Sequence, residues 1–457
     1  MTDDTTATEA PTAFAIFRQF FALERDVLVL SLAMFAFSLG FQMTSRFLPE
    51  YMWALGASGL VVGVFGTVGN VISAVYPYPG GAVSDRIGSR YALTLFGLLS
   101  TLGFGLWLLA PQVGPVYLAG VVVDPWIWIL IGLFPAQAWK SFGLGATFAV
   151  VKQATAPGRL AAGFASTETF RRTAFLVGPV LASALITLHP EFTVSFQFVL
   201  AVAVVFGAVG TLVQHVLYDA SEDSVGDSFR GVAQVRADLR SLPDPLRPLL
   251  VGDTLVRFAN GMVYVFFVLV VTRFLDVGFA ASVPVPWGRV SVDLSPQAFF
   301  GLLLGVEMAV ALLVMVPVAR LAERIGLKPV VATGFVVYAV FPVLLINAPA
   351  DPLALAALFA FSGLRFAGLP AHKALIVGPA ERGAGGRVTG SYYLVRNTVV
   401  IPSGLAGGLL WDGIPNPLTG ATLVPSSPTL AFTLASAIGL AGTGYFLLFG
   451  EEFEAYA

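Results

Sequence analysis

Residues 81–90 read GAVSDRIGSR, and residues 319–328 read ARLAERIGLK. The two segments lie 238 positions apart (319 minus 81), and in both of them an acid, an arginine, an isoleucine, a glycine and a base follow in the same order. Each segment comes directly after a long apolar stretch, 58–79 in the first case and 297–318 in the second. A short charged turn after such a stretch indicates a connection between two membrane-spanning helices. Its recurrence indicates that the chain consists of two related halves.

The composition of the whole chain favours the same interpretation. Hydrophobic residues make up 57% of the 457 residues and charged residues 11%, whereas a soluble domain has about 25% charged residues. A bilayer core needs about 20 apolar residues for each helix, so this length allows about twelve spans. Backbone groups in hydrocarbon must pair within their own segment, which makes a helix the expected structure of each span. The expected spans are 27–48, 58–79, 91–110, 125–150, 164–187, 194–217, 248–272, 297–318, 330–348, 352–375, 388–411 and 429–449.

A second set of matches supports an internal duplication. Lys140 in the fourth stretch corresponds to Arg365 in the tenth at an offset of 225 (365 minus 140), and the same offset relates Arg171 to Arg396. Many transporters contain such repeats. We therefore predict an all-α integral membrane protein with twelve transmembrane helices in two pseudo-symmetric six-helix bundles. The expected regions are a cytoplasmic tail with an interfacial helix (1–26), the first bundle (27–218), a cytoplasmic linker (219–247), the second bundle (248–449) and a cytoplasmic tail (450–457).

The positions of lysine and arginine predict the orientation. If both termini lie in the cytoplasm, most basic residues between the spans fall on the cytoplasmic side, and only Arg46, Arg273 and Arg289 fall on the opposite side. Basic residues near the ends of spans are retained in the cytoplasm. We expect a multi-pass protein of the cell membrane with both termini in the cytoplasm, and a monomer.

Several classes of function are disfavoured by the residues that the chain lacks. It has no cysteine, and its three histidines are far apart in sequence, so we expect no metal site. No GxxxxGK[ST] phosphate loop occurs, which excludes a built-in ATPase of that type. The net charge is −2 and no basic tract is present, so nucleic acid is not an expected partner. We expect no cofactor and no enzymatic activity; the expected partners are the lipid bilayer, a small-molecule substrate and protons.

The segment 81–90 resembles the signature that joins the second and third helices of the major facilitator superfamily, G-x-L-x-D-R-x-G-R-[RK]. It matches that signature at Gly81, Asp85, Arg86, Gly88 and Arg90. The second copy is more divergent and retains Glu323 and Arg324. Residues 387–412 also resemble the eleventh helix of the family. Gly178 and Pro179 resemble part of its antiporter signature, which slightly favours efflux over uptake.

The resemblance implies two bundles that rock about a central site. It implies that helices 1, 4, 7 and 10 line the cavity and that helices 2, 5, 8 and 11 form the interface between the bundles. It also implies that the acid of segment 81–90 meets the amino-terminal end of the eleventh helix, near residues 389–391, where free N–H groups favour an anion. We therefore interpret seven residues as a conformational switch: Gly81, Asp85, Arg86, Gly88, Arg90, Glu323 and Arg324.

Polar residues within the spans are the candidates for binding a solute, because an ionisable side chain in hydrocarbon is costly unless it faces protein or water. On the four helices that line the cavity in the family, the candidates are Gln42, Arg46, Lys140, Arg257, Asn260, Tyr264, Arg365 and His372. The alternative is structural: Lys140 and Arg365 tie helices together, and Asp253 and Arg257 neutralise each other at a spacing of four.

Glu307 is the one carboxylate near the middle of an expected span. Burial favours the protonated form of such a group, which suits a proton-coupling site. The alternative is that Glu307 pairs with an arginine across the interface between the bundles.

The leading hypothesis is a proton-coupled secondary transporter, with a slight preference for efflux of amphipathic compounds. Within the same class, an excess of cavity cations over acids favours organic or phosphorylated anions as the substrate. From another class, a transport-inactive membrane sensor with this fold and an intramembrane enzyme remain alternatives. An enzyme of that kind needs clustered histidines or acids near the interface.

Overall fold

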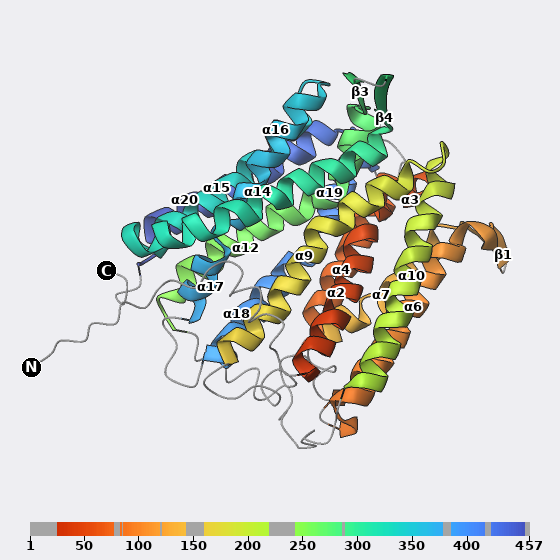
Figure 1. Cartoon of the computed structure of the whole chain (residues 1–457). Coiled ribbons are helices and arrows are strands. Elements are labelled where there is room, and N and C mark those ends of the chain that lie inside the picture. Colours follow the sequence, from red (N-terminus) through yellow and green to blue (C-terminus); the bar gives the residue numbers. More distant parts are fainter. Residues whose placement is uncertain are drawn as a thin grey trace, which may run out of the picture.

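The computed structural model describes residues 25–76, 83–84, 86–118, 121–142, 160–218, 243–285, 288–377, 385–415 and 422–452. Long helices run side by side through these residues, and the first and second halves of the chain lie next to each other (Figure 1). The labelled helices α2, α6, α7 and α10 lie on the right of the view and α12, α15, α16 and α20 on the left.

In the first half, each expected apolar stretch contains a helix. The helices are α2 (Arg25–Thr44), α3 (Leu48–Ala54), α4 (Gly59–Val75), α6 (Ser89–Val113), α7 (Ile127–Ala136), α9 (Leu160–Ile186) and α10 (Phe192–Leu217). Residues 138–142 are also helical and follow α7 after a turn at Gln137. Helix α2 packs against α9 and α10, and α6 packs against α7 and α10.

The second half is also helical, with more interruptions. Its helices are α12 (Leu246–Val263), η2 (Tyr264–Phe266), α13 (Phe267–Leu269), η3 (Val270–Phe274), α14 (Pro296–Ile325), α15 (Leu327–Ile346), α16 (Pro352–Gly363), η4 (Leu364–Phe366), α17 (Leu369–Val377), α18 (Gly385–Val400), α19 (Ser403–Asp412) and α20 (Pro428–Phe449). Helix α20 packs against α12 and α15, and α14 packs against α16.

Seven helices of the described residues are long and apolar enough to cross a membrane, and the bent pair Leu28–Thr44 and Leu48–Ala54 raises this number to eight. Other helices are broken within an expected span. Helices α18 and α19 are separated at Pro402, whose missing N–H group cannot continue the helical hydrogen bonds. The protein is therefore a multi-pass membrane protein, while the number of twelve spans remains a prediction.

Within the described residues, three two-stranded antiparallel hairpins connect helices, and none of them was expected from the sequence. They are β1 (Val116–Leu118) with β2 (Val121–Val123), β3 (Phe279–Val285) with β4 (Gly288–Leu294), and β5 (Ile414–Pro415) with β6 (Thr422–Val424). Backbone groups in a connection need hydrogen-bond partners as much as those in a helix, and a hairpin supplies them locally. The β3–β4 hairpin extends beyond the helices at the top of Figure 1.

The two halves meet where the family resemblance implies. Helix α4, in the second expected span, packs against α18 and α19, in the eleventh, and α9, in the fifth, packs against α14, in the eighth. Glycines permit the close approach of α4 and α19: a Cβ added to Gly63 would overlap with the backbone of Gly404 and Gly408.

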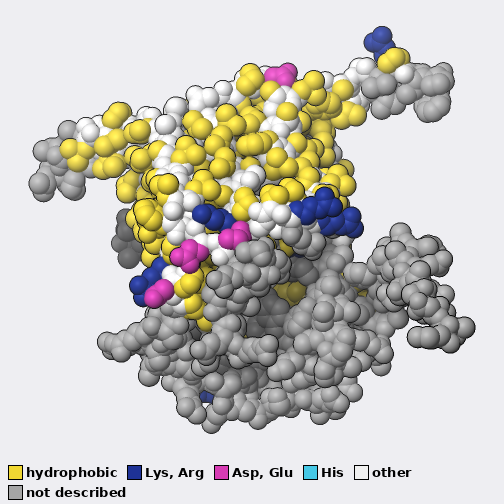
Figure 2. All heavy atoms as spheres, turned by 90° about the vertical axis from the view of Figure 1, so that its left-hand side faces the viewer, with side chains coloured by type: hydrophobic (Ala, Val, Ile, Leu, Met, Phe, Trp, Pro, Cys, Tyr) yellow, Lys and Arg dark blue, Asp and Glu magenta, His cyan; other side chains and the backbone are white. Residues whose placement is uncertain are grey.

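The outer surface of the helices is apolar. Figure 2 shows hydrophobic side chains over the upper part of one face, with basic and acidic side chains gathered below them. Leu313, Leu353 and Leu448 expose 74%, 74% and 78% of their surface. Large apolar side chains exposed in this way are stable against lipid tails and unfavourable in water.

Candidate substrate cavity and buried charge clusters

A cavity of about 330 Å³ lies between the two halves. The first half contributes side chains from α2, α4 and α9 and from residues 137–140, and the second half contributes η2, α14 and η4. Its polar lining residues are Gln42, Ser45, Arg46, Asn70, Ser73, Gln137, Lys140, Tyr264 and Glu307. Its apolar lining includes Phe41, Phe65, Trp107, Leu133, Phe175, Leu304, Met308 and Phe366. A mostly apolar cavity with a few polar groups is typical of small-molecule sites.

Glu307 on α14 is the acidic side chain of this cavity, and it is 3% exposed. Its Oε1 lies 2.6 Å from the Arg365 guanidinium and accepts a hydrogen bond of 2.5 Å from the Ser362 hydroxyl. Its Oε2 lies 3.6 Å from the guanidinium of Arg46, which belongs to the first half and stacks 4.0 Å over the Tyr264 ring. Glu307 therefore contacts an arginine of each half, which is the kind of contact that the structural alternative predicts.

Lys140 lies at another part of the cavity, where it is exposed to the cavity space. Its ammonium lies 4.0 Å from the centre of the Phe41 ring. Among the residues that the structure describes, no acid forms an ion pair with it. A neighbouring cavity of about 50 Å³ is also lined by Lys140, together with Ser38 and Arg171. The charge of Lys140 is thus available to a bound molecule.

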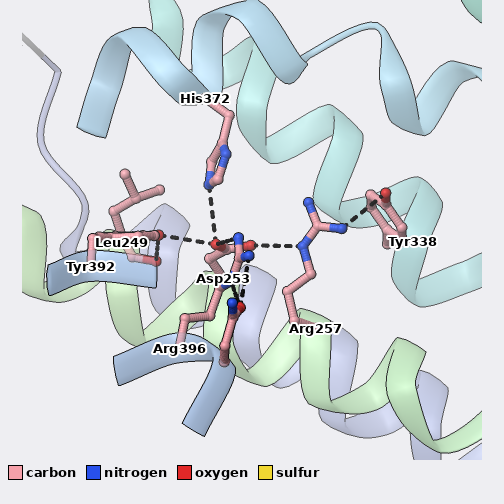
Figure 3. Close-up of polar contacts among 8 residues, drawn as sticks. Leu249, Asp253, Arg257, Tyr338, His372, Tyr392 and Arg396 are labelled. Carbon is pink, nitrogen blue, oxygen red and sulfur yellow. Dashed lines mark hydrogen bonds and ion pairs between the residues drawn. The ribbon is translucent and has the colours of Figure 1, made fainter. Parts of the chain in front are cut away.

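A second carboxylate, Asp253 on α12, is completely buried within the second half (Figure 3). Arg257 lies 3.2 Å from its Oδ1, while Arg396 and His372 lie 3.1 and 3.3 Å from its Oδ2. The Tyr392 hydroxyl donates to the same oxygen at 3.1 Å. The expected pair of Asp253 and Arg257 is present, but α17 and α18 add further partners that no local spacing predicts.

Tyr338 on α15 lies between the two clusters. Its hydroxyl accepts a hydrogen bond of 3.1 Å from Arg257, and the Arg365 guanidinium lies 5.1 Å from the centre of its ring. The carboxylates of Asp253 and Glu307 are therefore connected through two arginines and one tyrosine.

The structure separates the polar residues that the sequence placed on one face of the seventh span. Tyr264 lines the main cavity, whereas Arg257 points into the Asp253 cluster. Asn260 lies between them, and its buried Oδ1 has no hydrogen-bond partner among the described residues. Arg257 and Tyr264 are seven residues apart, about 10 Å along the helix axis, so their side chains reach different sites.

The eight expected binding residues therefore do not form one site but lie at different places in the structure. Those that line the main cavity are Gln42, Arg46, Lys140 and Tyr264. Arg365 is buried behind Glu307, while Arg257 and His372 belong to the Asp253 cluster.

One end of the interface, which we name the gate end, is held by two sets of polar contacts between the halves. Glu50 on α3 is completely buried and lies 2.8 Å from Arg273, while Gln297 and Thr272 donate to it at 3.0 and 2.9 Å.

The second set of contacts at the gate end involves Asp412, the last residue of α19. Its carboxylate accepts hydrogen bonds from the backbone N–H groups of residues 59 and 60 at 3.0 and 2.6 Å. From the sequence, Glu50 was expected only near the outer end of the first span, and Asp412 had no expected role. An acid at the carboxyl end of a helix interacts unfavourably with the helix dipole. The position of Asp412 therefore indicates, from the sequence alone, a stabilising partner in another segment.

The expected conformational switch is described only in part. Gly81, Asp85 and the side chain of Glu323 lie outside the described residues. Gly88 has a positive φ of 82° immediately before α6, a conformation that favours glycine. Arg86 and Arg324 are exposed, and Arg90 is partly buried.

Comparisons with known proteins agree with this architecture. No protein-family model matches the sequence. An uncharacterized MFS-type transporter of Methanocaldococcus jannaschii is 22% identical over 431 residues, which are 93% of this chain and 95% of the relative. The solved nucleoside transporter NupG has a TM-score of 0.68 at 12% identity, with 93% of this chain and 98% of that chain covered. A bacterial homologue of the iron transporter ferroportin in its inward-facing state has a TM-score of 0.69 at 13% identity, with 93% and 99% covered.

The fold and the cavity thus define a multi-pass membrane protein in which two packed helical halves enclose a charged cavity. Such proteins include the transporters that resemble it in sequence and in structure. The resemblance to the major facilitator superfamily is thereby confirmed, and the chain has the fold of its transporters.

Proposed function

We propose that this protein is a secondary active transporter that moves a small organic solute across the cell membrane by alternating access, coupled to protons. The observation that supports it best is the cavity at the contact between the halves, where Glu307 meets an arginine of each half. The transporters with the same fold support the transport class.

Glu307 is the proposed coupling group. Its carboxylate holds Arg46 of the other half at 3.6 Å, and a proton on Glu307 removes the charge that makes this contact favourable. Protonation therefore weakens a link between the halves and shifts the equilibrium between the two arrangements. Arg365 and Ser362 remain as hydrogen-bonding neighbours on the same side as Glu307.

The proposed topology has twelve spans, two six-helix bundles and both termini in the cytoplasm. In this orientation the connection between the seventh and eighth spans faces outward. Arg273 and the β3–β4 hairpin belong to that connection, so the gate end faces outward as well. The contacts of Glu50 and Asp412 then correspond to a closed outer gate. The protein acts as a monomer in this proposal, since each chain has its own cavity.

The direction of transport is proposed as efflux. Gly178, which belongs to the partial antiporter signature, packs closely against Gln42 of the cavity lining. A Cβ added to Gly178 would collide with that side chain. The apolar lining of the main cavity suits an amphipathic solute.

Transport by sealed inside-out vesicles tests the proposal. A panel of radiolabelled amphipathic solutes is offered with an imposed pH gradient, with the gradient reversed, and with the gradient collapsed by a protonophore. Gradient-dependent accumulation of at least one solute is expected for the parent and for Glu451→Gln, a matched change at an exposed acid. It is expected to be lost in Glu307→Gln, which mimics the protonated state. Accumulation by Glu307→Gln with the parental pH dependence contradicts the coupling role, and accumulation by none of the proteins contradicts transport of this class.

A further inference from the structure

The second half contains a compact arrangement of two donor side chains around one carboxylate. Arg365 lies 2.6 Å from Glu307, and the Ser362 hydroxyl donates to the same oxygen at 2.5 Å. The two donors come from α16 and η4, and the carboxylate comes from α14.

The internal repeat places a related arrangement in the first half. The offset of 225 that relates Lys140 to Arg365 also relates Gln137 to Ser362 (362 minus 137). The offset of 238 that relates the two charged turns relates position 307 to position 69 (307 minus 238), and that residue is Gly69. The first half therefore has a cation and a hydrogen-bond donor at the corresponding positions, with a glycine in place of the glutamate.

The structure brings these three residues of the first half to one place. Gly69, Gln137 and Lys140 all line the main cavity. A Cβ added to Gly69 would lie 3.7 Å from the Gln137 amide nitrogen, which is an ordinary contact distance, and would meet nothing closer. At Gly63 in the same helix, an added Cβ would instead overlap with the backbone of Gly404. Packing therefore requires glycine at position 63 and leaves space at position 69.

The donors beside this space have no anionic partner among the described residues. Lys140 forms no ion pair with any described residue, and the Gln137 amide makes no side-chain hydrogen bond within the described part of the chain. Around the cavity the described cations Arg46, Arg365 and Lys140 face a single acid, Glu307. An excess of positive charge in a low-dielectric site attracts an anion.

We propose that a carboxylate of the transported solute binds beside Lys140 and Gln137, in the position that corresponds to the Glu307 carboxylate beside Arg365 and Ser362. This proposal rests on the transport function proposed above and identifies its substrate class as a small organic monocarboxylate. The Lys140 ammonium has no ion-pair partner among the described residues, so it balances a single negative charge on the solute. The apolar part of the solute packs against Phe41 and Phe175, within a cavity of about 330 Å³.

A built-in carboxylate provides a test that needs no knowledge of the substrate. Gly69→Glu places an acid beside Lys140, and Gly69→Gln places a neutral side chain of the same shape there. Thermal unfolding of the purified proteins in detergent is measured in the parental background and with Lys140→Gln. We expect Gly69→Glu to melt about 2 °C or more above Gly69→Gln when Lys140 is present, and to lose this advantage with Lys140→Gln. Equal melting of the two variants in the presence of Lys140 overturns the proposed site.

A matched series of small ligands tests the same site in the parent protein, independently of whether the Gly69 variants fold. The probes are phenylacetate, its neutral amide phenylacetamide, and the cation phenethylamine, each measured by equilibrium binding. We expect phenylacetate alone to bind, with affinity reduced about tenfold by Lys140→Gln, largely retained by Lys140→Arg, and unchanged by Lys373→Gln, an exposed lysine that does not line the cavity. Equal affinity for the acid and the amide, absence of phenylacetate binding, or no effect of Lys140→Gln overturns the proposal.

The two proposals fail in different ways. Binding of phenylacetate that depends on Lys140, without gradient-driven movement of any solute, contradicts the transport function and supports the carboxylate site. Accumulation of a neutral or cationic solute that is insensitive to Lys140→Gln supports transport and contradicts the site.

Discussion

The Asp412 carboxylate at the end of α19 accepts a hydrogen bond of 3.0 Å from the backbone N–H of Gly59, the first residue of α4. The free N–H groups at the start of a helix carry partial positive charge, which a carboxylate stabilises. Since α4 and α19 belong to different halves, this contact favours the arrangement in which the gate end is closed.

Replacement of Asp412 by alanine is therefore expected to favour opening at the gate end. The loss of one anion at a helix start costs about 0.5–1 kcal/mol, which corresponds to a shift of two- to fivefold in the equilibrium. In this cysteine-free chain, a cysteine placed at Ser45 in the cavity lining reports the opening by its rate of reaction with an impermeant maleimide added outside. The rate should rise in Asp412→Ala and stay at the parental value in Asp293→Ala, an exposed acid of β4. Equal rates in the two variants would show that the contact does not bias the equilibrium.

Asp253→Asn is expected to destabilise the protein strongly. The change leaves Arg257 and Arg396 without their buried counter-charge, and breaking such a pair costs about 3 kcal/mol or more. The thermal unfolding temperature should fall by several degrees, whereas Asp244→Asn, whose side chain is 81% exposed, should leave it unchanged. An unchanged unfolding temperature in Asp253→Asn would show that the charge of Asp253 does not stabilise this cluster.

Lys140→Ala and Arg365→Ala should differ, although the two residues occupy repeated positions. Both are expected to impair transport. Arg365→Ala removes a buried partner of Glu307 and should also lower the unfolding temperature. Lys140→Ala removes a cation that lines the cavity and should raise the apparent KM without a loss of stability. Equal loss of stability in both variants would favour a structural role for Lys140.

The proposed topology predicts that Ser291 and Asp244 lie on opposite sides of the membrane. Each is exposed, so a cysteine at either position should react with an impermeant maleimide. Intact cells should label Ser291→Cys, and inside-out vesicles should label Asp244→Cys. Labelling of both positions from the same side would exclude this orientation.

The sequence predicted the helices well because they depend on local patterns. Runs of apolar residues require helices in a membrane, and the charged turns mark where they end. Lys140 and Arg365 were recognised as a repeated pair from the same local information.

The partners of the buried charges were harder to predict because they come from distant segments. Asp253 was assigned to Arg257 from a spacing of four, but His372 and Arg396 join it only because α17 and α18 pack beside α12. The polar residues of the seventh span reach two separate sites, because about 10 Å of helix lies between Arg257 and Tyr264, and spacing alone does not show which segments pack beside each of them.

The glycine contact between α4 and α19 has a mechanical consequence. Backbone touches backbone at Gly63, whereas further along α4 the Thr67 hydroxyl accepts a hydrogen bond from the Leu405 N–H and the Asn70 amide donates to the Val400 carbonyl. A tilt of α4 about Gly63 therefore has to break these two hydrogen bonds. Helix α4 extends four residues from Gly63 to its start and twelve to its end. At a constant rise per residue, a tilt about this point moves the far end about three times as far as the end near Asp412. A tilt that separates Asp412 from Gly59 would therefore move the opposite end of α4 by the larger distance.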